Sequence, residues 1–540
     1  MFTRDELIAA AGTKPIDGMI LPMRFAGGAI DSRQLTRGEL FVALAGQHTD
    51  GQCFIGDAVR AGASAILCSQ PSEAASSAGV PQVIVPNPLE VLQRLAQQHL
   101  HRQKSTRVIA ITGSNGKTSV KEATAWLLQS IAPTLKTLGN LNTETGVPLS
   151  LLRLNPEHRF AVLEMGAQWV GEISRLCRIA PPDIAVVTVV GHEHLEYFGS
   201  FENVALAEFE AVASLPTDGI AILNDDDRYV RKMIKRTKAR VVTYGRRPAA
   251  LVRAQRVAAD PRTGLCYRFT LSFGGQYARV ILNVPGVHAV TTALAAASVA
   301  LNCGAGVQAV AAGLGEIRPA KRRGEIKRGI NETILVDDSY NANRESAEAA
   351  IRMLRSAHVS PGARRWFIFG DMLELGKYSP EEHAQVGLSA AGAVDELVLV
   401  GAEVRATASA AVEAGMPAEH VHLFPAQLSE ANELACARIE AAAYTRDNLR
   451  PGDLLLVKGS LGTGMDAIVG ELQEKRAGHR LQTDITTRLQ QLTQAETALE
   501  AGASSKRRRK PAASEAGPDG RSGNQASYSV DVAMKARFPL

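Results

Sequence analysis

Short apolar runs recur along the chain and alternate with segments of helical spacing. Continuous apolar runs separated by helices are typical of parallel sheets whose two faces are both covered. One series begins near residue 106 and a second follows a break near residue 318, so the pattern predicts two α/β units. The runs are VIAI (from 108), FAVLE (160), IAVVTVV (184), IAIL (220) and VVTY (241), then TILVD (333), WFIFG (366), ELVLVG (396) and DLLLVKG (453).

The two ends of the chain differ from this α/β body. The first hundred residues carry shorter strand-like runs, LFVAL from 40, AILC from 65 and VIV from 83. Residues 502–540 are rich in Ala, Ser, Gly, Pro and charge and are not expected to bury a core, although 481–501 could form a helix. The predicted domains are a small mixed α/β N-terminal domain (1–105), a central parallel-sheet P-loop ATPase-like domain (106–318), a C-terminal Rossmann-like α/β domain (319–475) and a mostly disordered extension (476–540).

Composition and charge narrow the class of protein. Of the 540 residues, 45% are apolar and 21% charged, as in soluble globular proteins. No apolar run approaches the roughly 18 residues of a membrane span, and the start, MFTRDELIAA, lacks the apolar core of a signal peptide, so a cytoplasmic location is expected. The six cysteines are scattered singly, which argues against a zinc site or a disulfide framework. The net charge of +5 arises within residues 501–540, so no nucleic-acid partner is expected for the body.

A glycine-rich segment, TGSNGKTS at 112–119, follows the first central run. The general phosphate-loop pattern fails here, because it needs a glycine where the chain has Ile111. Successive backbone N–H groups before a helix still form an anion-binding concavity, in which Lys117 can neutralise phosphates and the Thr118 hydroxyl can ligate Mg²⁺. A tight turn with an incidental lysine is the alternative. The residues of the predicted nucleotide loop are Gly113, Ser114, Asn115, Gly116, Lys117, Thr118 and Ser119.

Two further polar clusters follow neighbouring runs. Glu164 ends FAVLE, and His192 and His194 lie in GHEHLEYFGS after IAVVTVV. Each alone has a plain explanation, a solvated or capping glutamate and surface-loop histidines. Ligands bind open α/β sheets beyond the carboxyl ends of strands, so the joint occurrence with the loop indicates a site for a Mg²⁺-nucleotide.

Eight motifs, three of which include the segments above, then resemble, in order and spacing, the Mur ligases over about residues 28–470. Within that family, DDSYNAN and GDMLELG are distinctive of the members that add D-alanyl-D-alanine. The family's phosphate loop has only two residues between its glycines, which explains the mismatch at Ile111. The motifs are TGSNGKTSVKE, GNLNTETGVPL, LEMGAQWVGEI, HLEYFGS, RRGEI, DDSYNAN, FGDMLELG and VKGS, together with IDSRQLTRGELFVALAGQHTDGQCFI at 30–55.

The resemblance implies an ATP- and Mg²⁺-dependent amide ligase of peptidoglycan precursor synthesis. Its substrates would be UDP-N-acetylmuramoyl-tripeptide and D-alanyl-D-alanine, joined through an acyl phosphate, and a monomer is expected. A carboxylate is a poor electrophile because oxide would have to leave, and phosphorylation supplies a better leaving group.

The resemblance also implies roles for individual residues. Catalysis would fall to Lys117, Glu164, His194 and Arg323. Beyond the loop, the nucleotide would contact His288, Arg323 and Asp338, and the metal ions Thr118, Glu164, His194 and Glu208. The substrates would contact Asn142, Thr143, Asn341 and Asn343, and the uridine diphosphate end Ser32, Arg33, Asp50 and Gly51, although DSR and DG are also ordinary turn sequences.

One departure from the family pattern lies in the metal site that the resemblance implies. The family usually has a lysine, carbamylated by carbon dioxide, where this chain has Glu208 in ALAEFE. A carbamate is an anionic oxygen ligand on a long arm, so a glutamate can replace its charge, directly or through a water. The alternative is a weaker second metal, or none.

Other departures concern recognition. Ala289 and Thr292 stand where the family commonly has asparagines that frame adenine, Arg344 replaces a proline, and Leu461 replaces an arginine.

The basic run KRRRK at 506–510 could bind an anionic partner or be functionally silent. Two other functions stay open: another amide ligase of the superfamily, and a non-catalytic nucleotide-binding protein that has lost the lysine at 208.

Overall fold

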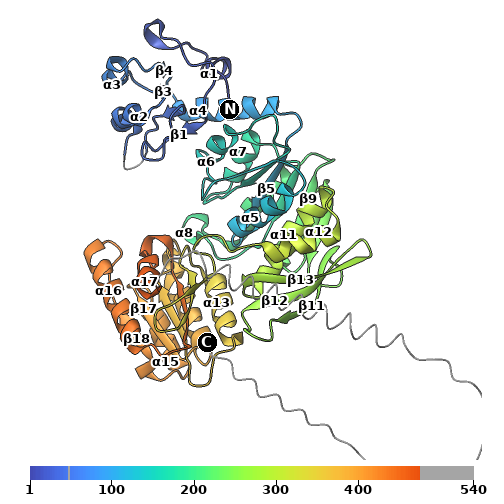
Figure 1. The fold of residues 1–540 in the computed structure, drawn as a ribbon, viewed down its shortest axis with the longest axis vertical. Coiled ribbons are helices and arrows are strands. Elements are labelled where there is room, and N and C mark those ends of the chain that lie inside the picture. Colours follow the sequence, from blue (N-terminus) through green and yellow to red (C-terminus); the bar gives the residue numbers. More distant parts are fainter. Residues whose placement is uncertain (47–48, 475–540) are drawn as a thin grey trace, which may run out of the picture. The chain divides into compact units, whose positions relative to one another are not determined.

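The computed structural model describes residues 1–46 and 49–474 (Figure 1). Across these residues the strands form three sheets, of four, nine and six strands. Parallel pairing dominates in each, and helices separate most of the paired strands along the chain. The predicted three-part α/β class is therefore confirmed. The predicted extension, 476–540, lies outside the described residues, as do the possible helix at 481–501 and the basic run at 506–510.

The first sheet is small and parallel throughout, in the order β1-β2-β3-β4. Its first helix begins at a capping box, because the Thr3 hydroxyl accepts from Glu6 N while the Glu6 carboxylate accepts from Thr3 N. Asn87 caps the last helix, which has Pro88 in its first turn. The elements are α1 (Arg4–Ala11), β1 (Gly28–Ala29), β2 (Leu40–Val42), α2 (Ile55–Ala61), β3 (Ala65–Cys68), α3 (Glu73–Ser77), β4 (Gln82–Ile84) and α4 (Pro88–Arg102), with 3-10 turns at Ile16–Gly18 and Gly51–Phe54.

The central sheet has the order β13-β12-β11-β10-β9-β8-β5-β7-β6. All five predicted central runs form neighbouring parallel strands in it. The elements are β5 (Arg107–Thr112), α5 (Lys117–Gln129), β6 (Thr134–Lys136), α6 (Gly146–Leu151), β7 (Phe160–Glu164), α7 (Glu172–Ile179), β8 (Ile184–Val187), α8 (Leu195–Phe198), α9 (Phe201–Ala213), β9 (Ile220–Asn224), α10 (Arg228–Met233), β10 (Arg240–Gly245), β11 (Val252–Ala259), β12 (Cys266–Phe273), β13 (Gln276–Pro285), α11 (His288–Asn302) and α12 (Val307–Glu316), with a 3-10 turn at Ile234–Arg236.

The continuous apolar runs arise because the central sheet is covered on both faces. Along β5, Val108 and Ala110 belong to one hydrophobic cluster and Ile109 and Ile111 to the other. The helices α5, α11 and α12 cover the second face, and Figure 1 shows α11 and α12 side by side. A strand with both faces buried has no polar alternation, which is why its run reads as unbroken.

The edge formed by β11, β12 and β13 was not predicted. Strand β12 is antiparallel to both neighbours, so the central sheet is mixed instead of wholly parallel. Gly274 and Gly275 form the turn between β12 and β13, both with positive φ, as a two-residue hairpin turn requires. This Gly-Gly pair lies between two runs that alternate apolar and polar residues, which is a usable sequence signal for a hairpin.

The third sheet has the order β14-β15-β19-β16-β17-β18 and is parallel except for β14 against β15. The four predicted runs form its inner strands. No described helix is both long and apolar enough to cross a membrane. The elements are β14 (Glu325–Arg328), β15 (Ile334–Asp338), α13 (Arg344–Ser356), β16 (Arg365–Gly370), α14 (Ser379–Ala390), β17 (Glu396–Val400), α15 (Arg405–Glu413), β18 (Val421–Phe424), α16 (Ala431–Asn448), β19 (Leu454–Lys458) and α17 (Asp466–Leu472), with 3-10 turns at Gly376–Tyr378, Ala418–His420 and Leu461–Thr463.

Candidate active site

The strand order of the central sheet brings the predicted polar clusters together. Strand β5 lies between β7 and β8, with Ile111 opposite Glu164 and Thr112 opposite Val187. The loop that follows β5 is therefore flanked by Glu164 on one side and by the loop after β8, which carries His194, on the other. This is the edge at which parallel sheets bind ligands.

Two glycines shape the loop between β5 and α5. Gly113 and Gly116 have φ values of +123° and +84°, which other residues rarely adopt. A Cβ on Gly113 would lie 2.0 Å from Thr188 Oγ1, so the loop packs directly against the strand-end backbone. Ser114 N donates to Val189 O at 2.8 Å, and Thr188 Oγ1 donates to Asn115 O at 2.6 Å. These contacts fix the loop ahead of the first turn of α5.

Gly113→Ala is expected to weaken ATP binding by about tenfold or more, because positive φ and the clash with Thr188 each cost on the order of 1–3 kcal/mol. Gly306→Ala is the matched control, since Gly306 has a φ of −76° and no atom within 4 Å of an added Cβ. Isothermal titration calorimetry with ATP would compare the two. An unchanged Kd for Gly113→Ala would contradict the assignment of this loop to the phosphates.

Glu164 is held by three neighbours at the end of β7. Its Oε1 accepts from Thr118 Oγ1 at 3.1 Å and from Asn142 Nδ2 at 3.0 Å. The Lys121 ammonium, which is fully buried, lies 3.4 Å from Oε2 and donates to Gly139 O at 2.9 Å. Oε2 itself accepts no hydrogen bond in the described structure. The carboxylate is thus fixed in place, and its buried Oε2 faces the Lys121 ammonium without a hydrogen bond.

Lys117 is surrounded by carboxylates. Its Nζ lies 2.8 Å from Glu193 Oε2. Burial alone would lower the pKa of Lys117, but the negative charges of Glu193, Glu208 and Glu164 outweigh burial and raise this pKa above its ordinary value. Lys117 therefore carries the positive charge that phosphate neutralisation needs.

Glu208 lies on α9, buried beneath the phosphate loop. Its Oε2 is 2.5 Å from Thr112 Oγ1, which also lies 2.9 Å from Met165 O. Because a hydroxyl has one proton, Thr112 can donate to only one of these oxygens at a time. Burial raises the pKa of Glu208 to about 7, against the opposing effects of the Lys117 charge and the Thr112 hydrogen bond. Glu208 thus contacts the start of the loop from the buried side, and its role as a metal ligand stays a prediction.

Glu208→Gln is expected to make the stability of the nucleotide-free protein less dependent on pH. A glutamate titrates at 4.5 when unfolded and Glu208 at about 7 when folded, so the folded state keeps a proton that the unfolded state loses. The resulting stabilisation is present below 4.5 and is lost as pH rises through about 7, a change of roughly 3 kcal/mol.

The melting temperature of the wild type should therefore fall more than that of Glu208→Gln between about pH 5 and about pH 8, measured by calorimetry. Glu202→Gln, an exposed glutamate on the same helix, should behave as the wild type. Parallel melting curves for wild type and Glu208→Gln would contradict a buried, titrating carboxyl at this position.

The loop after β8 is paired with glutamates that lie among the third-sheet elements. His192 Nδ1 hydrogen-bonds Glu345, in the first turn of α13, and His194 Nδ1 hydrogen-bonds Glu374, after β16. Burial would lower the pKa of His194, but the Glu374 hydrogen bond and the charge of Glu193 raise it. In many metal sites a hydrogen-bond partner at Nδ1 fixes the orientation of the imidazole, so that Nε2 can bind the metal.

The third-sheet residues predicted to bind nucleotide and substrate are fixed around Lys458. This buried ammonium lies 2.7 Å from Asp338 Oδ2 and donates to Asn341 O at 2.9 Å. The Arg323 guanidinium stacks on Tyr340, 4.0 Å from the ring centroid. Lys458 therefore holds the Asp338 side chain and the Asn341 backbone, and Tyr340 holds the Arg323 side chain.

Asn343 links the third-sheet elements to the phosphate loop. Its side-chain oxygen caps α13 by accepting from Ser346 N at 3.0 Å, and its Nδ2 donates to Asn115 Oδ1 at 3.0 Å. Both contacts are structural, and the predicted contact of Asn343 with the dipeptide stays a prediction.

A cavity of about 810 Å³ unites these groups. Of the departures from the family pattern, Thr292 and Leu461 line it, whereas Ala289 belongs to the buried core of the central domain. Among the predicted site residues in its wall are Ser114, Asn115, Gly116, Lys117, Thr118, Ser119, Asn142, Thr143, Glu164, His194, His288, Arg323, Asp338, Asn341 and Asn343. Gly113 and Glu208 lie behind the wall.

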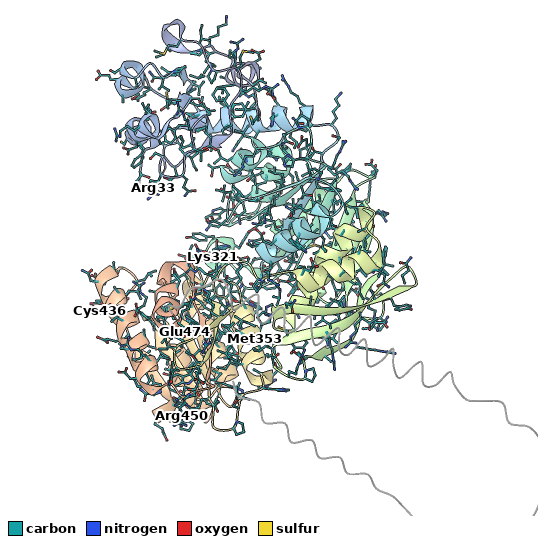
Figure 2. The ribbon with its side chains drawn as sticks, in the orientation of Figure 1. Arg33, Lys321, Met353, Cys436, Arg450 and Glu474 are labelled. Carbon is teal, nitrogen blue, oxygen red and sulfur yellow. The ribbon has the colours of Figure 1, made fainter. Side chains whose placement is uncertain are left out.

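The predicted uridine diphosphate residues do not line this cavity. Arg33 forms a two-pronged ion pair with Asp31, with both N···O distances 2.9 Å, and its side chain is 86% exposed at the edge of its domain (Figure 2). Asp50 accepts from Gln52 N at 2.9 Å, and a Cβ on Gly51 would lie 2.6 Å from Leu44 N. These local roles account for Asp50 and Gly51 as turn residues, and ligand contact, as for Ser32, stays a prediction.

Several residues of the site were missed in the sequence. Lys121, Glu193 and Glu374 had no assigned role, although GHEH placed Glu193 between two histidines already under consideration. Lys458 ends the run DLLLVK, so its position at a strand end was a usable signal. Nothing in the local sequence indicates that Lys121 would be buried against Glu164.

The donors at the cavity fit Mg²⁺ that arrives with a nucleotide. No group of three His, Cys, Asp or Glu side chains between residues 1 and 474, apart from 47–48, is arranged to hold a metal alone. The Glu164 carboxylate and the Thr118 hydroxyl supply oxygen atoms, which hard cations prefer as ligands. Mg²⁺ commonly takes one or two carboxylates and completes its shell with phosphate oxygens and water.

A phosphate loop, strand-end acids and a three-part α/β body together fit a nucleotide-binding enzyme, and comparison with known families gives its class. Three family models match in chain order: the Mur ligase family catalytic domain at 25–100, the Mur ligase middle domain at 111–300, and the Mur ligase glutamate ligase domain at 322–461. The chain belongs to the Mur ligase family.

Individual relatives are similar over nearly their whole length. The UDP-N-acetylmuramoyl-tripeptide–D-alanyl-D-alanine ligase of Escherichia coli K12 is 37% identical, over 82% of this chain and 93% of its own. A crystal structure of MurF from Acinetobacter baumannii has a TM-score of 0.75 at 29% identity, covering 88% of this chain and 99% of that one. MurF from Thermotoga maritima, solved in complex with ADP, has a TM-score of 0.68 at 25% identity, covering 82% and 96%.

Proposed function

We propose that this protein is an ATP-dependent amide ligase that joins D-alanyl-D-alanine to UDP-N-acetylmuramoyl-tripeptide in peptidoglycan precursor synthesis. The observation that carries the proposal is the 37% identity across 93% of a relative named for that activity. The cavity supports it, because the phosphate loop, Glu164 and the DDSYNAN segment line the same space. The DSYNAN and GDMLELG motifs argue against another amide ligase of the superfamily.

The reaction activates a carboxylate and then consumes the activated group. A carboxylate oxygen at the peptide end bonds to the γ-phosphorus of ATP while the bond to the bridging oxygen breaks, and ADP leaves. The amine nitrogen of D-alanyl-D-alanine then attacks the acyl carbon, the bond to the phosphate oxygen breaks, phosphate leaves, and the nitrogen gives up a proton. Both steps bring negatively charged groups close together, so the main requirement of the site is fixed positive charge.

We assign the charge neutralisation to Lys117 and Arg323. Lys117 is protonated and lies at the start of α5, where backbone N–H groups add to its charge. Asp338 is assigned to the ribose hydroxyls and His288 to the nucleotide. The Asp338 carboxylate accepts from Lys458 and has further lone pairs for a ribose.

The acceptor carboxylate is assigned to Asn142 and Thr143, and the incoming dipeptide to Asn341 and Asn343. Asn142 already donates to Glu164, which places it between the phosphate loop and the open cavity. The uridine diphosphate end is assigned to Ser32, Arg33, Asp50 and Gly51, outside the cavity.

Mg²⁺ is assigned to Thr118 and Glu164, with a second ion at His194 and Glu208. When bound, Mg²⁺ supplies charge neutralisation and orientation of the phosphates. Glu164 holds Thr118 and Asn142 in place before any cation arrives, and Glu374 fixes the imidazole of His194.

The division into domains at 105, 318 and 475 is part of the proposal, as are a monomeric state and a cytoplasmic location. All six cysteines are unpaired, and four of them, Cys68, Cys177, Cys266 and Cys303, have raised thiol pKa values because of burial. Unpaired thiols suit a reducing compartment.

Phosphate release from ATP tests the proposal. Purified protein should release phosphate only when UDP-N-acetylmuramoyl-tripeptide and D-alanyl-D-alanine are both present. A protein that bound ATP but released no phosphate in the complete mixture would be a non-catalytic nucleotide-binding protein instead.

A further inference from the structure

Glu193 has no role in the proposed reaction, yet it makes the most direct contact with Lys117. Its Oε2 is 2.8 Å from Lys117 Nζ, and its Oε1 is 3.7 Å from His194 Nε2. Only 15% of its side-chain surface is exposed, and it lines the cavity. Glu193 thus bridges the residue assigned to the phosphates and a residue assigned to the metal.

The charges around Lys117 explain why this contact matters. In the structure described, the ammonium that would neutralise the nucleotide is already neutralised by Glu193, with Glu208 and Glu164 nearby. A nucleotide without a cation would have to displace Glu193 from Lys117 and would then face its carboxylate. Like charges at such distances in a partly buried site repel strongly. A divalent cation offsets this repulsion, because carboxylate oxygens attract hard cations.

We propose that Glu193 makes nucleotide binding depend on the divalent cation, by competing with the phosphates for Lys117 when no cation is present. The inference rests on the proposed Mg²⁺-nucleotide function and deepens it. Glu193 acts on the nucleotide through Lys117, so it is a positioning residue. The protein therefore selects the Mg²⁺ complex of ATP over free ATP.

The experiment measures the Kd of ATP for the full-length protein by isothermal titration calorimetry, once with excess EDTA and once with excess Mg²⁺. The wild type should bind ATP much more tightly with Mg²⁺. In Glu193→Gln the affinity in EDTA should rise, so that the ratio of the two Kd values falls by about 5-fold to 150-fold, the usual range of coupling between two ligands. Glu202→Gln, an exposed change of the same type, should keep the wild-type ratio.

The outcomes separate the inference from the proposed function. A wild type that binds no nucleotide under either condition would overturn both. A wild type with a strong Mg²⁺ dependence that Glu193→Gln retains would overturn the inference alone. Equal weakening of both Kd values in Glu193→Gln would also overturn it, because a merely structural role lowers both affinities together. A melting temperature near that of the wild type confirms that the variant is folded.

Discussion

Lys117→Ala is expected to lower kcat for ligation by about 1,000-fold or more. The variant removes the protonated amine at the start of α5 that the structure holds against three carboxylates. Without it, the charge that develops on the transferring phosphoryl group lacks its nearest protein cation, and the carboxylates of Glu193 and Glu164 remain. Loss of a single stabilising donor in such sites typically costs 100-fold to 1,000-fold, roughly 3–4 kcal/mol, and uncompensated carboxylates add to this.

Lys104→Ala is the control for Lys117→Ala, because Lys104 is exposed in the turn before β5. It should leave kcat and KM unchanged. A coupled assay of ADP release with both substrates present measures these constants. Activity of Lys117→Ala within about tenfold of the wild type would contradict the assignment of Lys117 to the phosphates.

Glu208→Lys is expected to make activity depend on bicarbonate. The new ammonium would lie beside Lys117 and next to the Thr112 hydroxyl, where burial and like charge disfavour it. Reaction with carbon dioxide converts the amine into an anionic carbamate, with loss of a proton, and restores the negative oxygen ligand that the family usually has here. In buffer depleted of carbon dioxide, kcat should fall by about 100-fold or more, and added bicarbonate should restore most of it.

Glu202→Lys serves as the matched control on the same helix, since it makes the same charge change at an exposed position. Its activity should not respond to bicarbonate. Two results would contradict the interpretation of Glu208 as the carbamate's replacement: a Glu208→Lys variant as active as the wild type without bicarbonate, and a loss that bicarbonate does not restore.

The strands of the central sheet could be predicted because a strand buried on both faces appears in the sequence as an unbroken apolar run. Val108 to Ile111 alternate between two cores, so no polar residue interrupts the run. Glu164 and the loop after β8 end such runs, so a parallel sheet places them at the same edge as the phosphate loop, and the strand order β8-β5-β7 makes them its neighbours. Fold class and the centre of the site were therefore readable in the sequence.

The unpredicted features depend on contacts between distant segments. The pairing of His194 with Glu374 joins positions 180 residues apart, and that of Asn343 with Asn115 joins positions 228 apart. Neither pairing can be predicted from the residues nearby in the sequence. The burial of Lys121 and the pairing of Glu193 with Lys117 are similar, because each is decided by which charges the fold brings within a few ångströms.

In the proposed reaction ATP activates the peptide carboxylate, and transfer of a carboxylate oxygen to the released phosphate is the direct test of this step. UDP-N-acetylmuramoyl-tripeptide carrying ¹⁸O in its terminal carboxylate would be incubated with the protein, ATP, Mg²⁺ and D-alanyl-D-alanine, and the released phosphate analysed by mass spectrometry. One carboxylate oxygen bonds to phosphorus and leaves with it, so we predict one ¹⁸O atom in each phosphate from a fully labelled carboxylate. Phosphate without ¹⁸O, formed alongside amide product or without it, would mean that ATP does not activate the carboxylate.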